Sequence, residues 1–101
     1  MKILLNVKMP HQAFNAAVRD GTAGPKLTRI LETLKPEAAY FTEQNGQRSA
    51  ILIVELSDAS KIPAVAEPWF LSFEADVELR TVMTPDELKK AGLEELGKKW
   101  S

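Results

Sequence analysis

The sequence predicts one α+β domain, residues 1–101, with the element order βαββαβ and one further helix at the C-terminus. Three observations support this prediction. Apolar side chains alternate along residues 2–8 and along "EADVELRTVM", which is the period of a β-strand. Two apolar runs flank Asn45-Gly46, the preferred centre of a two-residue hairpin turn. Apolar residues at helical spacing lie between the first strand and this hairpin, and again after it.

Composition excludes several classes of function. The chain is 45% apolar and 27% charged, as is usual for a globular domain, and its net charge is −1. Such a charge, without runs of like sign, argues against electrostatic recognition of nucleic acid or of a membrane surface. There is no cysteine and only one histidine, His11, so neither a metal site nor a cofactor is expected. No signal-peptide pattern or long apolar segment is present, and a cytoplasmic location is therefore expected.

The first strand and the first crossover occupy residues 2–34. In the strand, Ile3, Leu5 and Val7 share one face. A helix is expected in "HQAFNAAVRDG", with an apolar stripe at Ala13, Phe14, Ala17 and Val18. A second helix is expected to start at Pro25, a favourable first-turn residue, and to stop before Pro36. Its stripe consists of Leu27, Ile30, Leu31 and Leu34.

The hairpin around Asn45-Gly46 predicts its own register. A two-residue turn pairs Gln44 with Gln47, and Phe41 then faces Ala50. One face of the hairpin is then almost wholly apolar: Ala39, Phe41, Ala50, Leu52, Val54 and Leu56. The other face is mixed: Ala38, Tyr40, Thr42, Ser49, Ile51, Ile53 and Glu55.

The second crossover is expected to be a helix over about residues 59–72, capped by Asp58 or Ser60. Pro68 lies in its middle, where proline removes a hydrogen bond, so a kink or a split is predicted there. We also expect Trp69 or Phe70 to pack inward beside it. After the fourth strand, Thr84 and Glu87 form a capping box, and the last helix is expected to run to about Leu96 and stop at Gly97.

Two right-handed crossovers connecting four strands give a ferredoxin-like sheet with helices on one face. The third strand, "SAILIVEL", is apolar on both faces. Leu52 and Val54 can meet the helices, while Ile51 and Ile53 remain on the open face with Leu4, Tyr40 and Val82. Leaving such side chains in water forfeits roughly 1.5–3 kcal/mol each relative to burial. The sequence therefore predicts a homodimer in which two copies pack sheet against sheet about a two-fold axis.

Three segments resemble a small bacterial family without an assigned activity in the dimeric α/β-barrel superfamily. They are "KPEAAYFTEQNGQRSAILIVEL", "IPAVAEPWFLSFEADVELR" and "VMTPDEL", and the resemblance covers most of the chain. It implies a dimeric α/β barrel. The wider superfamily implies small-molecule pockets, in cofactor-free monooxygenases, muconolactone-type isomerases and haem-degrading enzymes. Fold alone does not choose among these activities.

Few residues are candidates for chemistry. His11, where the first strand gives way to helix, suits a general base or a haem ligand, although a solvated first-turn residue is the favoured interpretation. Glu67, beside Trp69 and Phe70, suits a pocket wall that orients a flat ligand. The favoured alternative is that the aromatics are core and that Glu67 is exposed, with no cavity touching it. Tyr40 suits either a cavity hydrogen bond or a dimer contact.

Three functions are consistent with these features. The first is a homodimer that binds a small ligand between helices and sheet, or serves as an interaction module. The second is a cofactor-independent monooxygenase or isomerase acting on small aromatic or lactone substrates, with His11 or Glu67 as acid or base. The third is an amino-acid-sensing regulatory domain, since such domains share the βαββαβ order. RNA binding is disfavoured, because the open face carries Ile51, Ile53, Glu55 and Glu78 instead of aromatic and basic side chains.

Overall fold

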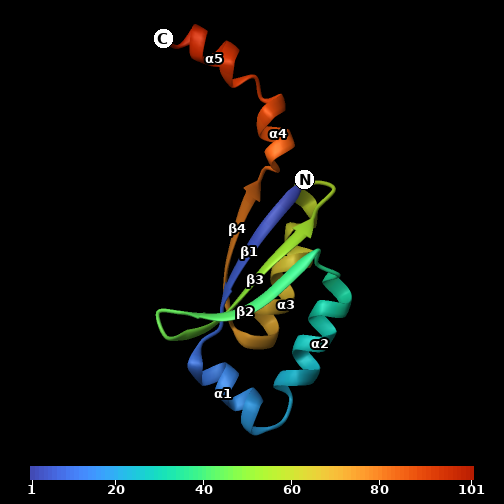
Figure 1. Ribbon diagram of the computed structural model, residues 1–101. Helices are drawn as coiled ribbons and strands as arrows, with labels where there is room; N and C mark the ends of the chain where they lie inside the picture. Colours follow the sequence, from blue (N-terminus) through green and yellow to red (C-terminus); the bar gives the residue numbers. More distant parts are fainter.

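Four strands form one antiparallel sheet in the order β2-β3-β1-β4, and helices cover one of its faces (Figure 1). The computed structural model describes residues 1–101. The strands are β1 (Lys2–Lys8), β2 (Ala38–Gln44), β3 (Gln47–Glu55) and β4 (Asp76–Val82). The first crossover contains α1 (His11–Arg19) and α2 (Ala23–Leu34), and the second contains a 3₁₀ turn, η1 (Ala59–Lys61), and α3 (Ile62–Phe73). This mixed α+β arrangement is compatible with the ferredoxin-like fold expected from the sequence.

The β2–β3 turn confirms the predicted hairpin register. Asn45 and Gly46 have φ values of 54° and 78°, so both adopt the left-handed conformation that a type I′ turn requires. Gln44 pairs with Gln47 and Phe41 with Ala50. Because side chains alternate along a strand, this register also fixes which residues of β2 and β3 face the helices.

The core lies between the sheet and its helices and contains 15 buried residues in one cluster. Leu5 and Val7 of the central strand β1 are fully buried, as are Trp69 and Phe73 of α3. The Phe14 ring of α1 stacks on Phe73 with 5.0 Å between ring centroids. Each large apolar side chain in such a position stabilises the fold by roughly 1.5–3 kcal/mol relative to exposure.

Two expectations for the helical side need correction. Helix α2 begins at Ala23, two residues before Pro25, which therefore lies within the first turn, where no amide donor is needed. Val18 of α1 is half-exposed instead of joining the apolar stripe. Phe41 is also half-exposed, although it shares a face with Leu52, because β2 is an edge strand.

Of the two outcomes predicted at Pro68, the split is wrong, because α3 is continuous from Ile62 to Phe73, while the kink stays a prediction. Proline removes only the hydrogen bond to Ala64, while buried side chains lie on both sides of it and anchor each half of the helix to the sheet. Trp69 is fully buried, which confirms the predicted inward packing, whereas Phe70 is 38% exposed.

The C-terminal helix breaks at Gly92 and not at Gly97. Gly92 has φ = 76° and separates α4 (Pro85–Lys90) from α5 (Leu93–Lys99), which continues through Gly97. The predicted capping box is present: Thr84 Oγ1 accepts from the Glu87 amide at 3.1 Å, and Glu87 Oε1 accepts from the Thr84 amide at 2.9 Å. Neither helix buries a residue, and both extend away from the sheet (Figure 1).

No helix in the structure combines the length and the apolar character that a membrane span requires.

Replacing Pro68 with alanine should raise the free energy of unfolding by about 1 kcal/mol, because the new amide can donate to Ala64 within a helix that is already continuous. Pro63 is the matched control. It lies in the first turn of α3, where the backbone needs no amide donor. Pro63→Ala should therefore lower the free energy of unfolding by about 0.5 kcal/mol, because the unfolded chain gains conformational entropy. Urea unfolding of both variants measures the difference, and a loss of stability in Pro68→Ala would contradict the expectation.

Candidate functional site

Two grooves open on the helical side of the molecule. The larger, here called the end groove, has a volume of about 550 Å³. It lies where α2 ends, β3 ends and α3 begins, at the end of the sheet that holds the chain's N-terminus (Figure 1). Its lining residues are Met1, Thr33, Leu34, Glu55, Leu56, Ser57, Lys61, Ala64 and Val65.

Local backbone structure holds the end groove open. Lys35 ends α2 in a left-handed conformation, with φ = 46°, and the chain turns away from the helix there. At the end of β3, the Leu56 amide donates to the Met1 carbonyl at 2.9 Å, which extends the pairing with β1 by one residue. The Asp58 carboxylate then accepts from the Ser60 amide at 2.9 Å and caps the turn that leads into α3. Specific backbone conformations and hydrogen bonds therefore fix the end of α2, the end of β3 and the start of α3, which together form the rim of the groove.

Most charged groups at or near the end groove form ion pairs, but one lysine does not. The N-terminal ammonium of Met1 lies 2.6 Å from Glu55 Oε1, and Lys2 Nζ lies 2.5 Å from Glu37 and 3.7 Å from Glu55. The hydrogen bond from the Met1 ammonium holds the pKa of Glu55 below its usual value, and the hydrogen bond with Glu37 raises the pKa of Lys2. Lys61 makes no ion pair. It is the unpaired cation of a groove whose walls are formed by Leu34, Leu56 and Val65.

This combination defines the chemistry that the end groove can perform. Its volume lies within the roughly 300–1,000 Å³ usual for small-molecule sites. Apolar walls favour a flat or aliphatic body, and an ammonium at the rim favours an anionic or strongly polarised oxygen. No group of three or more His, Asp or Glu side chains comes together in a way that could hold a metal ion.

The second groove, here called the helix groove, lies between α2 and α3 and has a volume of about 470 Å³. Five of its eight lining residues are polar or charged, and the eight are Lys26, Arg29, Ile30, Thr33, Glu67, Pro68, Leu71 and Ser72. Glu67 is exposed, as expected, but it lines this groove, whereas we expected that no cavity would touch it. The groove is also not the apolar cavity that the alternative interpretation required.

The structure does not bring the candidate residues together. His11 is the exposed first residue of α1, at the opposite end of the sheet from the end groove (Figure 1). Tyr40 pairs with Ile51 on the open face and is 68% exposed, whereas Trp69 is buried on the helical face. The sheet therefore separates Tyr40 from Trp69. The Trp69 indole N–H is buried without a hydrogen-bond partner, and Trp69 lines neither groove. The roles assigned to His11, Glu67, Tyr40, Trp69 and Phe70 remain predictions.

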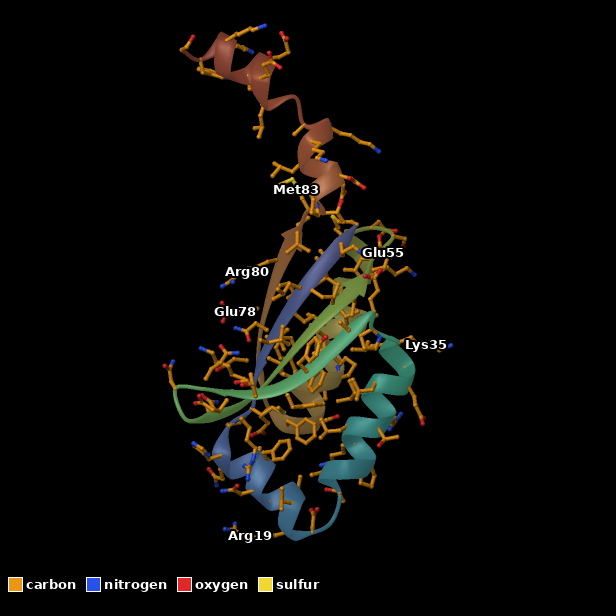
Figure 2. All side chains as sticks on the ribbon, viewed as in Figure 1. Arg19, Lys35, Glu55, Glu78, Arg80 and Met83 are labelled. Atoms are coloured by element: carbon orange, nitrogen blue, oxygen red, sulfur yellow. The ribbon has the colours of Figure 1, made fainter.

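The open face of the sheet is apolar at its centre and polar around it. Leu4, Ile51, Ile53 and Val82 are each only partly covered. Asn6 and Gln44 exchange hydrogen bonds between their side-chain amides, and Asn6 also donates to Glu78 at 3.4 Å. Figure 2 shows Glu78 and Arg80 side by side at the β4 edge, where Arg80 lies 3.5 Å from Glu78. The side chains of Asn6, Gln44, Glu78 and Arg80 are thus paired within the chain.

Sequence reasoning missed the contribution of Lys61, Leu34 and Leu56 to a groove, and only the two leucines carry a weak signal. Leu34 ends a helical stripe, and Leu56 follows a strand immediately before a turn. These signals specify burial and give no indication that three chain ends meet at one place, because that meeting depends on tertiary packing.

Replacing Glu55 with glutamine should lower the melting temperature at pH 7, because it removes the ion pairs with the Met1 ammonium and Lys2. The pKa of Glu55 is lower in the folded chain than in the unfolded one, so this contribution is present at neutral pH and is lost as pH falls through the folded pKa. The two proteins should therefore melt alike once Glu55 is protonated. Thermal melts from pH 7 to pH 2 measure this, with Glu94→Gln, at a residue without an ion pair, as the control. A difference between the two proteins that does not shrink as pH falls would contradict it.

Comparisons with known proteins inform the fold. No family model matches the sequence, and no curated protein sequence matches it. Among solved structures, the chain is similar to 5-chloro-2-hydroxyhydroquinone dehydrochlorinase (TftG) from Burkholderia phenoliruptrix AC1100, in its complex with 2,5-dihydroxybenzoquinone. The TM-score is 0.63 at 16% sequence identity, and the match covers 85% of this chain and 97% of that one. At this identity the likeness establishes a shared small α+β fold.

Proposed function

We propose that this chain is a small-ligand-binding protein that acts as a homodimer and holds its ligand in the end groove. The observation that carries the proposal is the pairing of apolar walls with the unpaired ammonium of Lys61 in a groove of about 550 Å³. The structural neighbour is an enzyme solved in complex with a small ring compound, which supports the proposal of a small ligand for this fold. We expect the ligand to be a small aromatic or lactone-like molecule with an acidic oxygen that pairs with Lys61.

The open sheet face supports the homodimer and the dimeric α/β barrel that it implies. Ile51 and Ile53 lie at the centre of this face, next to Leu4 of β1. Burying apolar side chains of this size contributes roughly 1.5–3 kcal/mol each. Asn6, Gln44, Glu78 and Arg80 already pair with one another within the chain, so a second copy can cover these four side chains without leaving them unpaired.

A second candidate function is a cofactor-independent monooxygenase or isomerase acting on small aromatic or lactone substrates. The likeness to a dehydrochlorinase of a substituted hydroquinone favours it. Of the two acid or base candidates, Glu67 is the one that lines a groove, which it shares with Lys26 and Arg29. If Glu67→Gln leaves turnover of such substrates unchanged, Glu67 has no place in a catalytic scheme.

The homodimer is tested by placing a carboxylate at the centre of the open face. Ile53→Glu should raise the dimer dissociation constant at least 100-fold, because association would bury an unpaired charge. Sedimentation velocity at micromolar concentration measures this. Val18→Glu makes the same chemical change at a half-exposed position of α1 and should leave the dimer intact. A wild-type chain that sediments only as a monomer would refute the proposal.

The ligand class is tested by thermal shift with a panel of small aromatic carboxylates, hydroxyquinones, lactones and amino acids. Anionic aromatic compounds should raise the melting temperature, and Lys61→Met should weaken their binding at least tenfold through loss of the charge-assisted contact. Lys89→Met, on the exposed surface of α4, is the matched control and should bind as the wild type does. Stabilisation by amino acids alone would favour the sensory-domain interpretation instead.

A further inference from the structure

The C-terminal arm, defined here as residues 83–101, carries apolar side chains that nothing in the chain covers. It leaves the end of β4, and its two helices extend away from the sheet, so that the whole chain measures 59 × 29 × 19 Å (Figure 1). Its large apolar side chains are between 43% and 77% exposed: Met83, Leu88, Leu93, Leu96 and Trp100. Figure 2 shows Met83 at the base of the arm.

The pattern of α5 is that of a helix built to lie on a surface. Leu93, Leu96 and Trp100 follow the spacing i, i+3, i+7 and form one apolar stripe. The remaining side chains include two glutamates and two lysines, Glu94, Glu95, Lys98 and Lys99, whose charges cancel. Helices of six and seven residues, such as α4 and α5, are not stable in water by themselves. The arm therefore needs an apolar contact that its own domain does not provide.

We infer that the arm packs its apolar stripe against a second copy of this chain, an inference that rests on the homodimer proposed above. The arm continues from the open face: Val82, the last residue of β4, lies on that face opposite Lys2, and the arm begins at the next residue. Only Met83 and Thr84 separate β4 from α4, and the capping box at Thr84 fixes how α4 starts. The connection between β4 and α4 is thus too short and too well ordered to let α4 fold back easily onto its own domain.

The size of the interface also favours this assignment. Four strands of about seven residues, about 4.8 Å apart and rising about 3.3 Å per residue, present a face of roughly 440 Å². A standard stable interface buries about 800 Å² per partner. One side of the two arm helices, about 20 Å long together and about 10 Å wide, adds roughly 200 Å². Both areas are flat outlines, and the arm enlarges that of the sheet face by nearly half. Its balanced charge gives it no attraction to anionic lipid or nucleic acid.

The two tryptophans make the inference testable in the full chain. Trp69 is fully buried and Trp100 is 77% exposed. A decrease in the solvent exposure of tryptophan on association therefore indicates that Trp100, in the arm, has become covered. Acrylamide quenching and the emission maximum of tryptophan fluorescence are measured at protein concentrations from nanomolar to tens of micromolar. Sedimentation over the same range gives the fraction of dimer. We expect the Trp100 signal to become shielded and blue-shifted over the same concentration range in which the dimer forms. Trp100→Phe removes this signal and isolates that of Trp69.

Two sets of substitutions separate the arm from the sheet face. Leu93→Glu with Leu96→Glu should raise the dimer dissociation constant at least tenfold, while circular dichroism stays that of a folded domain, since α5 contributes no core residue. Lys98→Gln changes the charge on the polar side of α5 and should alter the constant less than twofold. Ile53→Glu should leave Trp100 exposed at every concentration.

The outcomes distinguish this inference from the proposal on which it rests. A chain that stays monomeric throughout overturns both. A dimer in which Trp100 remains fully quenchable, or which the double substitution does not weaken, overturns the arm contact alone. Shielding of Trp100 that is independent of concentration means that the arm folds onto its own domain, and this too overturns the contact between copies.

Discussion

The left-handed turn at Asn45 and Gly46 sets the pairing of β2 with β3, and the two sides of the molecule depend on that pairing. With Phe41 opposite Ala50, Leu52 and Val54 enter the core beside the central strand β1. The same pairing places Ile51 and Ile53 on the opposite face. A slip of one residue would exchange the two sets, bringing Thr42, Ser49 and Glu55 to the core side and sending Leu52 and Val54 to the open face. The core and the proposed association surface therefore share one local cause.

The features predictable from the sequence are those that neighbouring residues determine. The hairpin register and the Thr84–Glu87 capping box are confirmed because each is decided within a few residues. Pro68 and Gly92 show where local rules fail. Packing of buried side chains on both sides of Pro68 outweighs one lost hydrogen bond, and the left-handed conformation at Gly92, not the presence of glycine, decides where the last helix breaks.

The site was less predictable than the fold, again for a physical reason. The end groove exists because the end of α2, the end of β3 and the start of α3 meet, and no short segment encodes that meeting. Glu55 links this groove to the other side of the molecule. By its position in β3 it belongs to the open face, yet it also lines the groove and binds the Met1 ammonium. The proposed ligand site and the proposed association surface therefore have one carboxylate in common.

The strand order leaves β2 and β4 as the two edges of the sheet, and they differ in how well they resist aggregation. An edge strand offers unpaired backbone groups on which another chain can add a strand, and charged side chains oppose this. Along β4, charges recur at Asp76, Glu78 and Arg80. Strand β2 carries one charge, Glu43, and exposes the aromatic rings of Tyr40 and Phe41. Wherever β2 stays uncovered, solubility at high concentration is limited by this edge, and a lysine in place of an outward-facing β2 residue is the change that would protect it.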